Sequence, residues 1–212
     1  MALSKMSWDE LNQLVGYKIS EPYDEYFDPM QISEEQKQKR IKMAEEIESV
    51  MADLLIEMFY AEQYDTPVFD VAYRDAVQAY IAALAVLGIE PDDYLQNHAE
   101  EIIANVLEVL SKHQDDPWFY SKDRAIALAE GESNSIWNYT EYEDAVKNKR
   151  WKTWHTIMDG RERESHAEAN GTRIPINDVF HLQGGDCYFP RDDSLGMSDE
   201  EIISCRCSLS FS

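Results

Sequence analysis

Trp151-Lys152-Thr153-Trp154-His155 opens the stretch of sequence that decides the fold, and Cys205-Arg206-Cys207 closes it. Within this stretch the hydrophobic residues change from the spacing of helices to the alternation of strands. Trp151, Thr153 and the two alternate positions after them share one face, as in a strand with two differently used faces. The segments before this stretch have the spacing of helices, so the chain is predicted to be an α+β protein.

Turn signals divide this stretch into short elements. Asp159-Gly160 and Gly184-Gly185 are typical of tight turns. Ser198 and Glu201 have the spacing of a capping box at a helix start. The predicted elements are a short helix over 161–169 that ends at Gly171, and strands over 151–158, 173–179, 187–190 and 203–212.

Two cysteines and a histidine form a candidate metal site. If Cys205 and Cys207 lie on one strand, both sulfurs point to the same face, and His166 with either Asp159 or Cys187 could complete a tetrahedron around Zn²⁺. A single Cys-x-Cys lacks the doubled pattern of recognised zinc modules. The alternative is that both cysteines are small core residues and that His166 hydrogen-bonds Asp159 to close the turn.

The order and spacing of these residues resemble a known family. The matching positions are Trp151-x-Thr153, Asp159-x-Arg161-x-Arg163-x-x-His166, Gly171, Ile174-Pro175, Phe180, Gly185, Phe189-Pro190 and Glu201-x-x-x-Cys205-Arg206-Cys207. They resemble the C-terminal domain of phage Mu F-like head-morphogenesis (minor capsid) proteins. The similarity extends into the preceding segment at 124–129 and 132–134, although Glu130-Gly131 stands where the family usually has Arg-Thr.

The resemblance implies a minor head protein in the capsid interior near the portal, made in the host cytoplasm during assembly. It implies a role in head morphogenesis and in DNA packaging or ejection, with the portal protein and other capsid or scaffold proteins as partners. It also implies a structural motif built from Trp151, Asp159, Arg161, Arg163, His166, Gly171 and Arg206. Arg161 and Arg163 could clamp carboxylates bidentately, or they could lie on a solvated face of the short helix.

The preceding part of the chain, residues 1–147, is predicted to be an acidic helical module, and residues 148–212 the Mu F-like domain. Hydrophobic residues at spacings of three and four predict helices from about Glu34, from Thr66-Pro67 to Gly88, after Pro91, and over 121–147. Ser7 with Glu10 and Ser33 with Gln36 have capping-box spacing. Residues 17–30 are predicted to form an irregular arm or loop.

Charge is distributed unevenly along the chain. Residues 1–146 carry 10 Lys and Arg against 31 Asp and Glu, which gives −21 of the total −23. Such a surface disfavours strong direct DNA binding and favours basic protein partners, because DNA affinity rests on Lys and Arg neutralising phosphates; an acidic face that only maintains solubility is the alternative. The absence of a long apolar run predicts a protein without a membrane span, and the first ten residues lack an export signal.

Enzymatic functions are the alternatives. Glu130-Gly131-Glu132 matches the carboxylate pair of arginine-directed ADP-ribosyltransferases, but it falls in a predicted helix with no Ser-Thr-Ser stretch before it. Cys187 with His166 or His181 lacks a third orienting group for a hydrolase. We therefore expect an architectural protein with a structural Zn²⁺ at most, and keep an ADP-ribosyltransferase-like or metal-dependent effector or toxin enzyme as the alternative.

Overall fold

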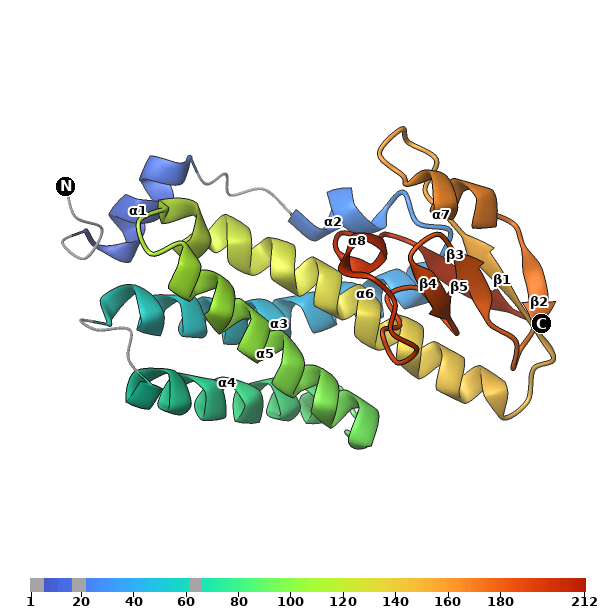
Figure 1. Cartoon of the computed structure of the whole chain (residues 1–212), viewed down its shortest axis with the longest axis horizontal. Helices are drawn as coiled ribbons and strands as arrows, with labels where there is room; N and C mark the ends of the chain where they lie inside the picture. The colour runs from blue at the N-terminus through green and yellow to red at the C-terminus, as the bar shows by residue number, and fades with distance from the viewer. Residues whose placement is uncertain (1–5, 17–21, 62–65) are drawn as a thin grey trace. The chain divides into compact units, whose positions relative to one another are not determined.

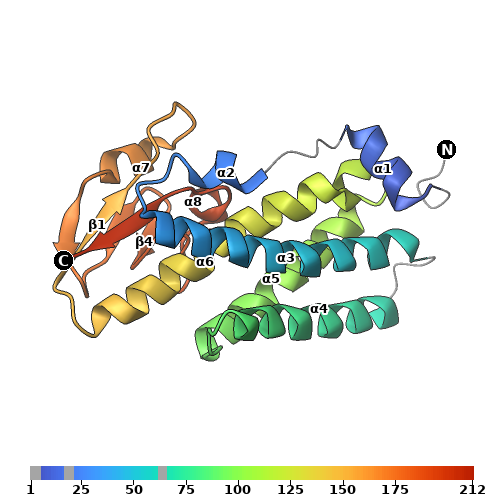
Figure 2. The same ribbon diagram turned by 180° about the vertical axis from the view of Figure 1, so that it is seen from behind.

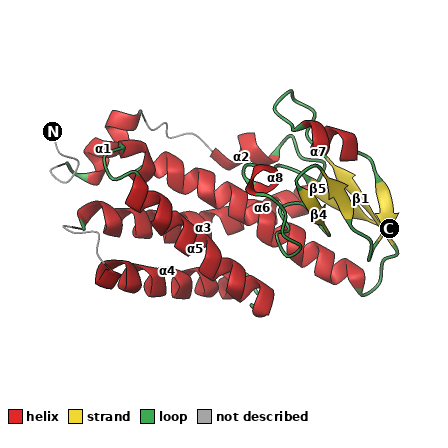
Figure 3. Cartoon of the chain, viewed as in Figure 1, coloured by secondary structure: helices red, strands yellow, loops and turns green. Residues whose placement is uncertain are grey.

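The computed structural model describes residues 6–16, 22–61 and 66–212. Its described elements are helices followed by a small region of antiparallel strands near the C-terminus (Figure 3), which confirms the predicted α+β class. The chain forms two compact units: one comprises residues 1–20 and 42–129, and the other comprises residues 21–41 and 130–212. The second unit thus includes segments that precede the boundary expected at residue 147.

The first unit is helical (Figure 1). It contains α1 (Trp8–Val15), α4 (Thr66–Val86), α5 (Asp93–Lys112), the 3-10 helix η2 (Pro117–Tyr120), and parts of α3 (Glu34–Tyr60) and α6 (Lys122–Val146). Helices α4 and α5 pack against each other. The hydrophobic stripe predicted for α3 is confirmed as core, since these residues are all buried: Ile47, Val50, Met51, Leu54, Leu55, Met58 and Phe59.

Helix starts follow the predicted capping chemistry. Ser7 and Glu10 form a reciprocal capping box at α1, and Ser33 and Gln36 form the same pair of hydrogen bonds at the start of α3. Gly88 follows α4 with a φ of +75°, a conformation that glycine adopts at little cost. These local signals fixed the helix boundaries because they satisfy backbone groups that the helix itself leaves unpaired.

The second unit combines helical segments with two small sheets. Its helical parts are α2 (Pro22–Phe27), residues 34–41 of α3, residues 130–146 of α6, α7 (Glu164–Ala169) and α8 (Asp199–Ile202). Strand β1 (Trp151–His155), labelled in Figure 2, is central in an antiparallel sheet of order β2-β1-β5. Its neighbours are β2 (Arg173–Pro175) and β5 (Ser208–Phe211). Strands β3 (Phe180–Leu182) and β4 (Gly185–Cys187) form a separate hairpin.

Several predicted elements differ from those observed. Residues 22–27 form α2 rather than an irregular arm, and residues 17–21 lie outside the described residues. The strand predicted over 187–190 is displaced, since the Gly184-Gly185 turn joins two strands that end at Cys187. The last strand begins at Ser208 rather than at residue 203, because Ser204 has a φ of +57°, which no extended strand accommodates.

No helix among the described residues is long and apolar enough to cross a membrane.

Candidate metal centre

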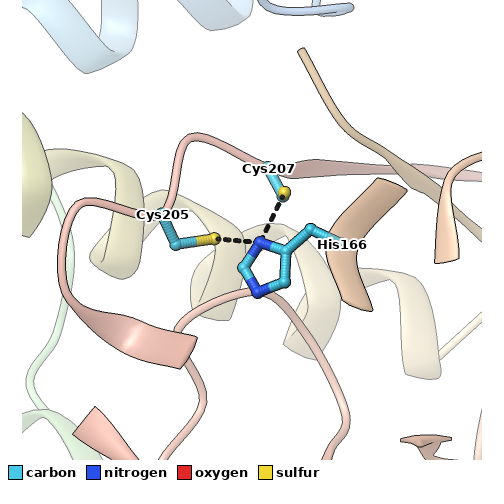
Figure 4. Close-up of side chains that lie close together, drawn as sticks. All are labelled: His166, Cys205 and Cys207. Atoms are coloured by element: carbon cyan, nitrogen blue, oxygen red, sulfur yellow. Dashed lines mark hydrogen bonds between the residues drawn. The ribbon is translucent and has the colours of Figure 1, made fainter. Parts of the chain in front are cut away.

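Three buried side chains of the second unit meet at one point (Figure 4). His166 lies on α7, and Cys205 and Cys207 lie on the segment between α8 and β5. The Nδ1 atom of His166 is 3.4 Å from Cys207 Sγ and 3.7 Å from Cys205 Sγ. All three residues are at most 2% exposed. The structure therefore brings together three of the four predicted metal ligands.

These separations suit a tetrahedral zinc ion. Zinc binds thiolate sulfur at about 2.3 Å and imidazole nitrogen at about 2.0 Å, which at the tetrahedral angle places the sulfur and nitrogen about 3.6 Å apart. The two observed distances fall on either side of that value. Among the described residues these ligand atoms all lie within 4.8 Å of one another. The cluster could therefore hold a metal ion.

The two cysteines point to the same side, but they do not lie on a strand as predicted. They lie before β5 rather than within it, and the exposed Ser204 between α8 and Cys205 takes the left-handed conformation. Both thiols are nevertheless buried, so the alternation of the sequence correctly indicated their common face. Thr156 supports this arrangement, because its Oγ1 donates to the His166 carbonyl at 2.7 Å and lies 3.5 Å from Cys207 Sγ.

A buried carboxylate lies on the far side of the imidazole. Glu201 Oε2 is 2.8 Å from His166 Nε2, although the ring is not turned to align a hydrogen bond. Ser165 Oγ donates to both carboxylate oxygens at 2.9 and 3.1 Å, and the Gly184 amide donates to Oε1 at 3.1 Å. A carboxylate at the remote nitrogen is the usual second partner of a metal-binding histidine, because it orients the ring and strengthens the ligand.

The sequence missed this role of Glu201. Its distance from Ser198 predicted a capping box, but Ser198 caps α8 without a side-chain hydrogen bond. Glu201 instead turns inward to the histidine and is 6% exposed. Its place four residues before Cys205 in the motif was the available signal. Ser198 is the N-cap of α8, but the side-chain hydrogen bonds of the predicted capping box are not formed.

The pKa shifts in the cluster favour one thiolate, that of Cys205, which shares its negative charge through its hydrogen bonds with Cys207 and His166. The hydrogen bond with Cys207 and then the contact with His166 hold the pKa of the Cys205 thiol well below its usual value, although burial opposes this. The same bond, with burial, raises the pKa of Cys207. Burial lowers the pKa of His166. The interactions with Cys205 and Glu201 raise this pKa by more than burial lowers it, so the net shift is upward. A cation at this point would replace these protons.

Two asparagines of α6 bind the backbone of the segment between α8 and β5, residues 203–207, which we call the cysteine segment. Asn134 Nδ2 donates to the Cys207 carbonyl at 3.1 Å, and Asn138 Nδ2 donates to the same oxygen at 3.1 Å. Their own oxygens accept from the buried Arg40 guanidinium of α3, which also binds Glu141 at 3.0 Å. This network, which we call the Arg40 network (Arg40, Asn134, Asn138 and Glu141), fixes the backbone that carries the sulfurs.

Asp159 lies in an ion-pair cluster and not among the metal ligands of the described residues. Its carboxylate accepts from Arg161 at 2.7 Å and from Arg206 at 2.8 Å. These two guanidinium groups, Arg161 first, hold the pKa of Asp159 well below its usual range. Arg161 and Arg163 precede α7 rather than lying on it, and Arg163 Nη2 donates to the Ile203 carbonyl. The cluster joins the turn after β1 to the cysteine segment.

The remaining motif residues shape the sheet. Trp151 exchanges backbone hydrogen bonds with Ser212, and its ring lies under the Arg173 guanidinium at 4.9 Å. Gly171 has a φ of +76° and donates its amide to the Trp154 carbonyl at 2.8 Å. A side chain at this position would strain the turn that returns α7 to β1, which explains the glycine.

The groups considered for enzymatic chemistry lie elsewhere. Glu132 is buried on α6 and paired with Arg191 at 3.2 Å, so it does not face a substrate. Burial raises the pKa of the Cys187 thiol, which disfavours the nucleophilic thiolate. His181 is exposed and pairs with Asp186 at 2.7 Å. Among the described residues, these groups do not assemble with the cysteine and histidine cluster.

Two curated proteins are similar to part of this chain. One is the uncharacterized protein YqbB of Bacillus subtilis (strain 168), 31% identical over 125 residues, which cover 52% of this chain and 40% of that protein. The other is the NAD(+)--arginine ADP-ribosyltransferase EFV of Enterococcus faecalis (strain ATCC 700802 / V583), 27% identical over 128 residues, which cover 55% of this chain and 26% of that protein. The chain therefore spans less than half of each relative.

No solved structure matches the chain. The family model described as "Phage Mu protein F like protein" matches residues 97–210, which include the whole of α6, the two sheets except the last residue of β5, and the three residues of the candidate metal centre. This range is more than half of the chain and confirms the resemblance carried by the C-terminal motif, including its extension into the preceding helix. The chain belongs to the phage Mu protein F-like family.

Proposed function

We propose that this protein is a phage head-morphogenesis protein that acts as a minor capsid protein in virion assembly. The family match over residues 97–210 carries this proposal. The fold agrees with an architectural role, because the motif residues are engaged in ion pairs, turns and a buried cluster. The protein is expected in the virion after assembly in the host cytoplasm.

We further propose the portal protein as its partner, with a location inside the capsid near the portal and a role in DNA packaging or ejection. The charge of −21 over residues 1–146 supports a basic protein partner and opposes strong direct DNA binding. This acidic helical module would make the contact, as the sequence predicts.

A groove on the second unit offers an additional contact surface. It has a volume of about 510 Å³ and is lined by Glu164 and Glu168 of α7 and by half-buried apolar side chains of β2 and β3, including Ile174 and Leu182. Two exposed carboxylates above an apolar floor suit a segment with basic and apolar side chains.

Co-purification with the portal tests the partner. The full chain and the portal protein encoded with it would be co-expressed, and the portal ring isolated at low and at high salt. We expect the chain to sediment with the ring and to be released by salt, because charged contacts are screened. Glu164→Lys with Glu168→Lys should weaken binding if the groove takes part; sedimentation of the ring without the chain at low salt would refute the portal contact.

We propose that the centre holds a structural Zn²⁺. The two sulfur distances and the carboxylate behind His166 support it. Elemental mass spectrometry on untagged protein should find one zinc per chain, lost in Cys205→Ser and in His166→Ala and retained in the control Cys187→Ser. A wild-type protein that contains no zinc and takes none up on dialysis would refute the site.

The ADP-ribosyltransferase activity is named for the Enterococcus protein, of which this chain matches 26%. In this chain the helical position of Glu130-Gly131-Glu132 and the Arg191 contact of Glu132 give that activity no support. We therefore propose the architectural function alone.

A further inference from the structure

We propose that the metal of this centre has three protein ligands and an open fourth position, which holds a water molecule that a small anion can replace. The proposal rests on the zinc site proposed above and specifies its coordination. It distinguishes a centre with an exchangeable position from a closed site with four protein ligands.

The described residues provide three ligands, and two carboxylates that could supply a fourth are engaged elsewhere. Cys187, the other predicted candidate, is not in the group of mutually close ligand atoms. Asp159 has both carboxylate oxygens bound by Arg161 and Arg206. Glu201 contacts the remote nitrogen of the imidazole, and Ser165 and Gly184 hold it there. Neither carboxylate lies with the two sulfurs and the Nδ1 atom in the group of mutually close ligand atoms.

A small cavity adjoins the same three ligands. It has a volume of about 20 Å³ and is lined by His166, Cys205 and Cys207, together with side chains of the turn after β1 and of the cysteine segment. One water molecule needs roughly 10 to 15 Å³ of such volume. The cavity thus has room for a single water or a small monodentate ligand, and not for another side chain.

The charges around the cavity favour an anion. Three arginines line it, Arg161, Arg163 and Arg206, against one lining acidic residue, Glu162. Asp159 neutralises part of this charge through Arg161 and Arg206. A zinc ion with two thiolates and a neutral imidazole is uncharged, so an added monoanion would leave one negative charge beside a wall that carries about one net positive charge.

Cobalt substitution tests the open position on the full chain. Protein freed of metal by a chelator would be loaded with Co²⁺, and its visible absorption followed while sodium azide is added. We expect one Co²⁺ per chain with tetrahedral bands and thiolate charge-transfer bands, and a saturable shift of the tetrahedral bands as azide replaces water. Neutral imidazole at the same concentration should shift them less.

Two variants sharpen the result. Thr156→Cys places a thiol where Oγ1 now lies 3.5 Å from Cys207 Sγ, so it should close the site, add charge-transfer intensity and abolish the azide response. Arg206→Gln, once loaded with Co²⁺, should require about tenfold more azide for the same shift.

The possible failures are distinguishable. A wild-type protein that binds one Co²⁺ per chain, but whose bands do not move with azide, overturns the open position and leaves the zinc proposal in place. A protein that binds no Co²⁺ and no Zn²⁺ overturns the metal site itself. The wild-type titration decides both questions even if Thr156→Cys does not fold.

Discussion

At the scale of single residues, Glu201 decides how firmly the centre would hold a metal. Its carboxylate contacts His166 Nε2 and is itself held by Ser165 and by the Gly184 amide. Such a partner fixes the ring with its other nitrogen toward the metal. The effect of Glu201 should therefore appear in metal affinity rather than in the number of metals bound.

Glu201→Gln is expected to weaken Zn²⁺ binding about 10- to 100-fold, because the amide orients the imidazole less well and no longer increases its basicity. Competition with a chromogenic chelator measures the affinity. Glu200→Gln is the matched control, since Glu200 is the adjacent exposed residue and should change nothing. Equal affinities of the two variants would contradict the orienting role.

Glu130 is predicted to make stability depend on pH. Burial, and then the charge of Glu25, raise its pKa to about 7. Between the ordinary pKa of 4.5 and this value the folded state binds the proton that the unfolded state has lost, so the contribution of Glu130 to stability falls as pH rises through this window. Glu130→Gln should remove this loss, which we expect to be about 2 kcal/mol once the full shift is discounted for the partial solvent exposure of the side chain.

Urea unfolding at about pH 5 and about pH 8 measures the effect of Glu130 on stability, as the difference in unfolding free energy between wild type and Glu130→Gln. The variant should gain stability relative to wild type at the higher pH only. Glu143→Gln on the same helix is the control, because Glu143 is exposed and should not shift the pH dependence. A gain of equal size at both pH values would exclude titration of Glu130 as the cause.

At the scale of elements, the Arg40 network joins the first turns of α3 to the middle of α6 and, through the asparagine amides, to the cysteine segment. Arg40 is fully buried, and its charge is matched by Glu141. A buried charge network is costly to break because the remaining partners stay unpaired.

Arg40→Met should cost about 3 kcal/mol of unfolding free energy, because it leaves the Glu141 carboxylate without its charged partner and two asparagine oxygens without their donor. Denaturant unfolding measures this loss. Lys39→Met is the control: Lys39 pairs with Glu35 at the exposed surface, and its loss should cost less than about 0.5 kcal/mol. A cost for Arg40→Met as small as the control's would show that the network contributes little.

The long helices were predictable from the sequence to within a residue or two, because caps and hydrophobic spacing are local properties. Among the short helices, α2 was predicted to be an irregular arm, and the helix predicted over 161–169 begins at Glu164. The short strands were less predictable: Cys187 ends β4 instead of starting a strand, and a turn at Ser204 precedes β5. Lys152 illustrates why tertiary contacts make such strands harder to read from the sequence. It lies in the alternating strand, yet it is fully buried with its Nζ over the rings of Tyr142, Phe180 and Tyr188, a tertiary contact that no spacing rule contains.

The candidate site was only partly predictable, because tertiary contacts also decide the roles of its carboxylates. Cys205 and Cys207 are close in sequence, and His166 was identified by its chemistry, so the three could be grouped without a structure. Asp159 and Glu201 were assigned other roles, since a carboxylate in sequence does not show whether an arginine or an imidazole lies beside it. Only the fold places Arg206 beside Asp159 and His166 beside Glu201.

At the scale of the whole molecule, the Mu F-like part depends on sequence on both sides of residue 147. The family match begins at residue 97, and the second compact unit includes residues 21–41 and 130–146. The asparagine amides that hold the Cys207 carbonyl come from this earlier sequence. We propose that 148–212 is not an independent folding domain.

A fragment of residues 148–212 is therefore expected to lack ordered structure. It contains the sequence of all the strands but lacks α6 and the Arg40 network. Amide dispersion in a proton–nitrogen NMR spectrum measures this, with the full chain as control. Supplying Zn²⁺ should not restore the native spectrum. A dispersed spectrum of the fragment alone would instead support the boundary that the sequence predicts.

The short β2 at the side of the sheet limits how the protein can associate. A sheet edge with free backbone groups can recruit further strands and lead to aggregation, and proteins protect such edges with short strands, charges and proline. Strand β2 has three residues, begins with Arg173 and ends with Pro175, which has no amide hydrogen to donate. Copies crowded together in a confined volume would thus resist edge-to-edge polymerisation along β2 and remain available for specific assembly.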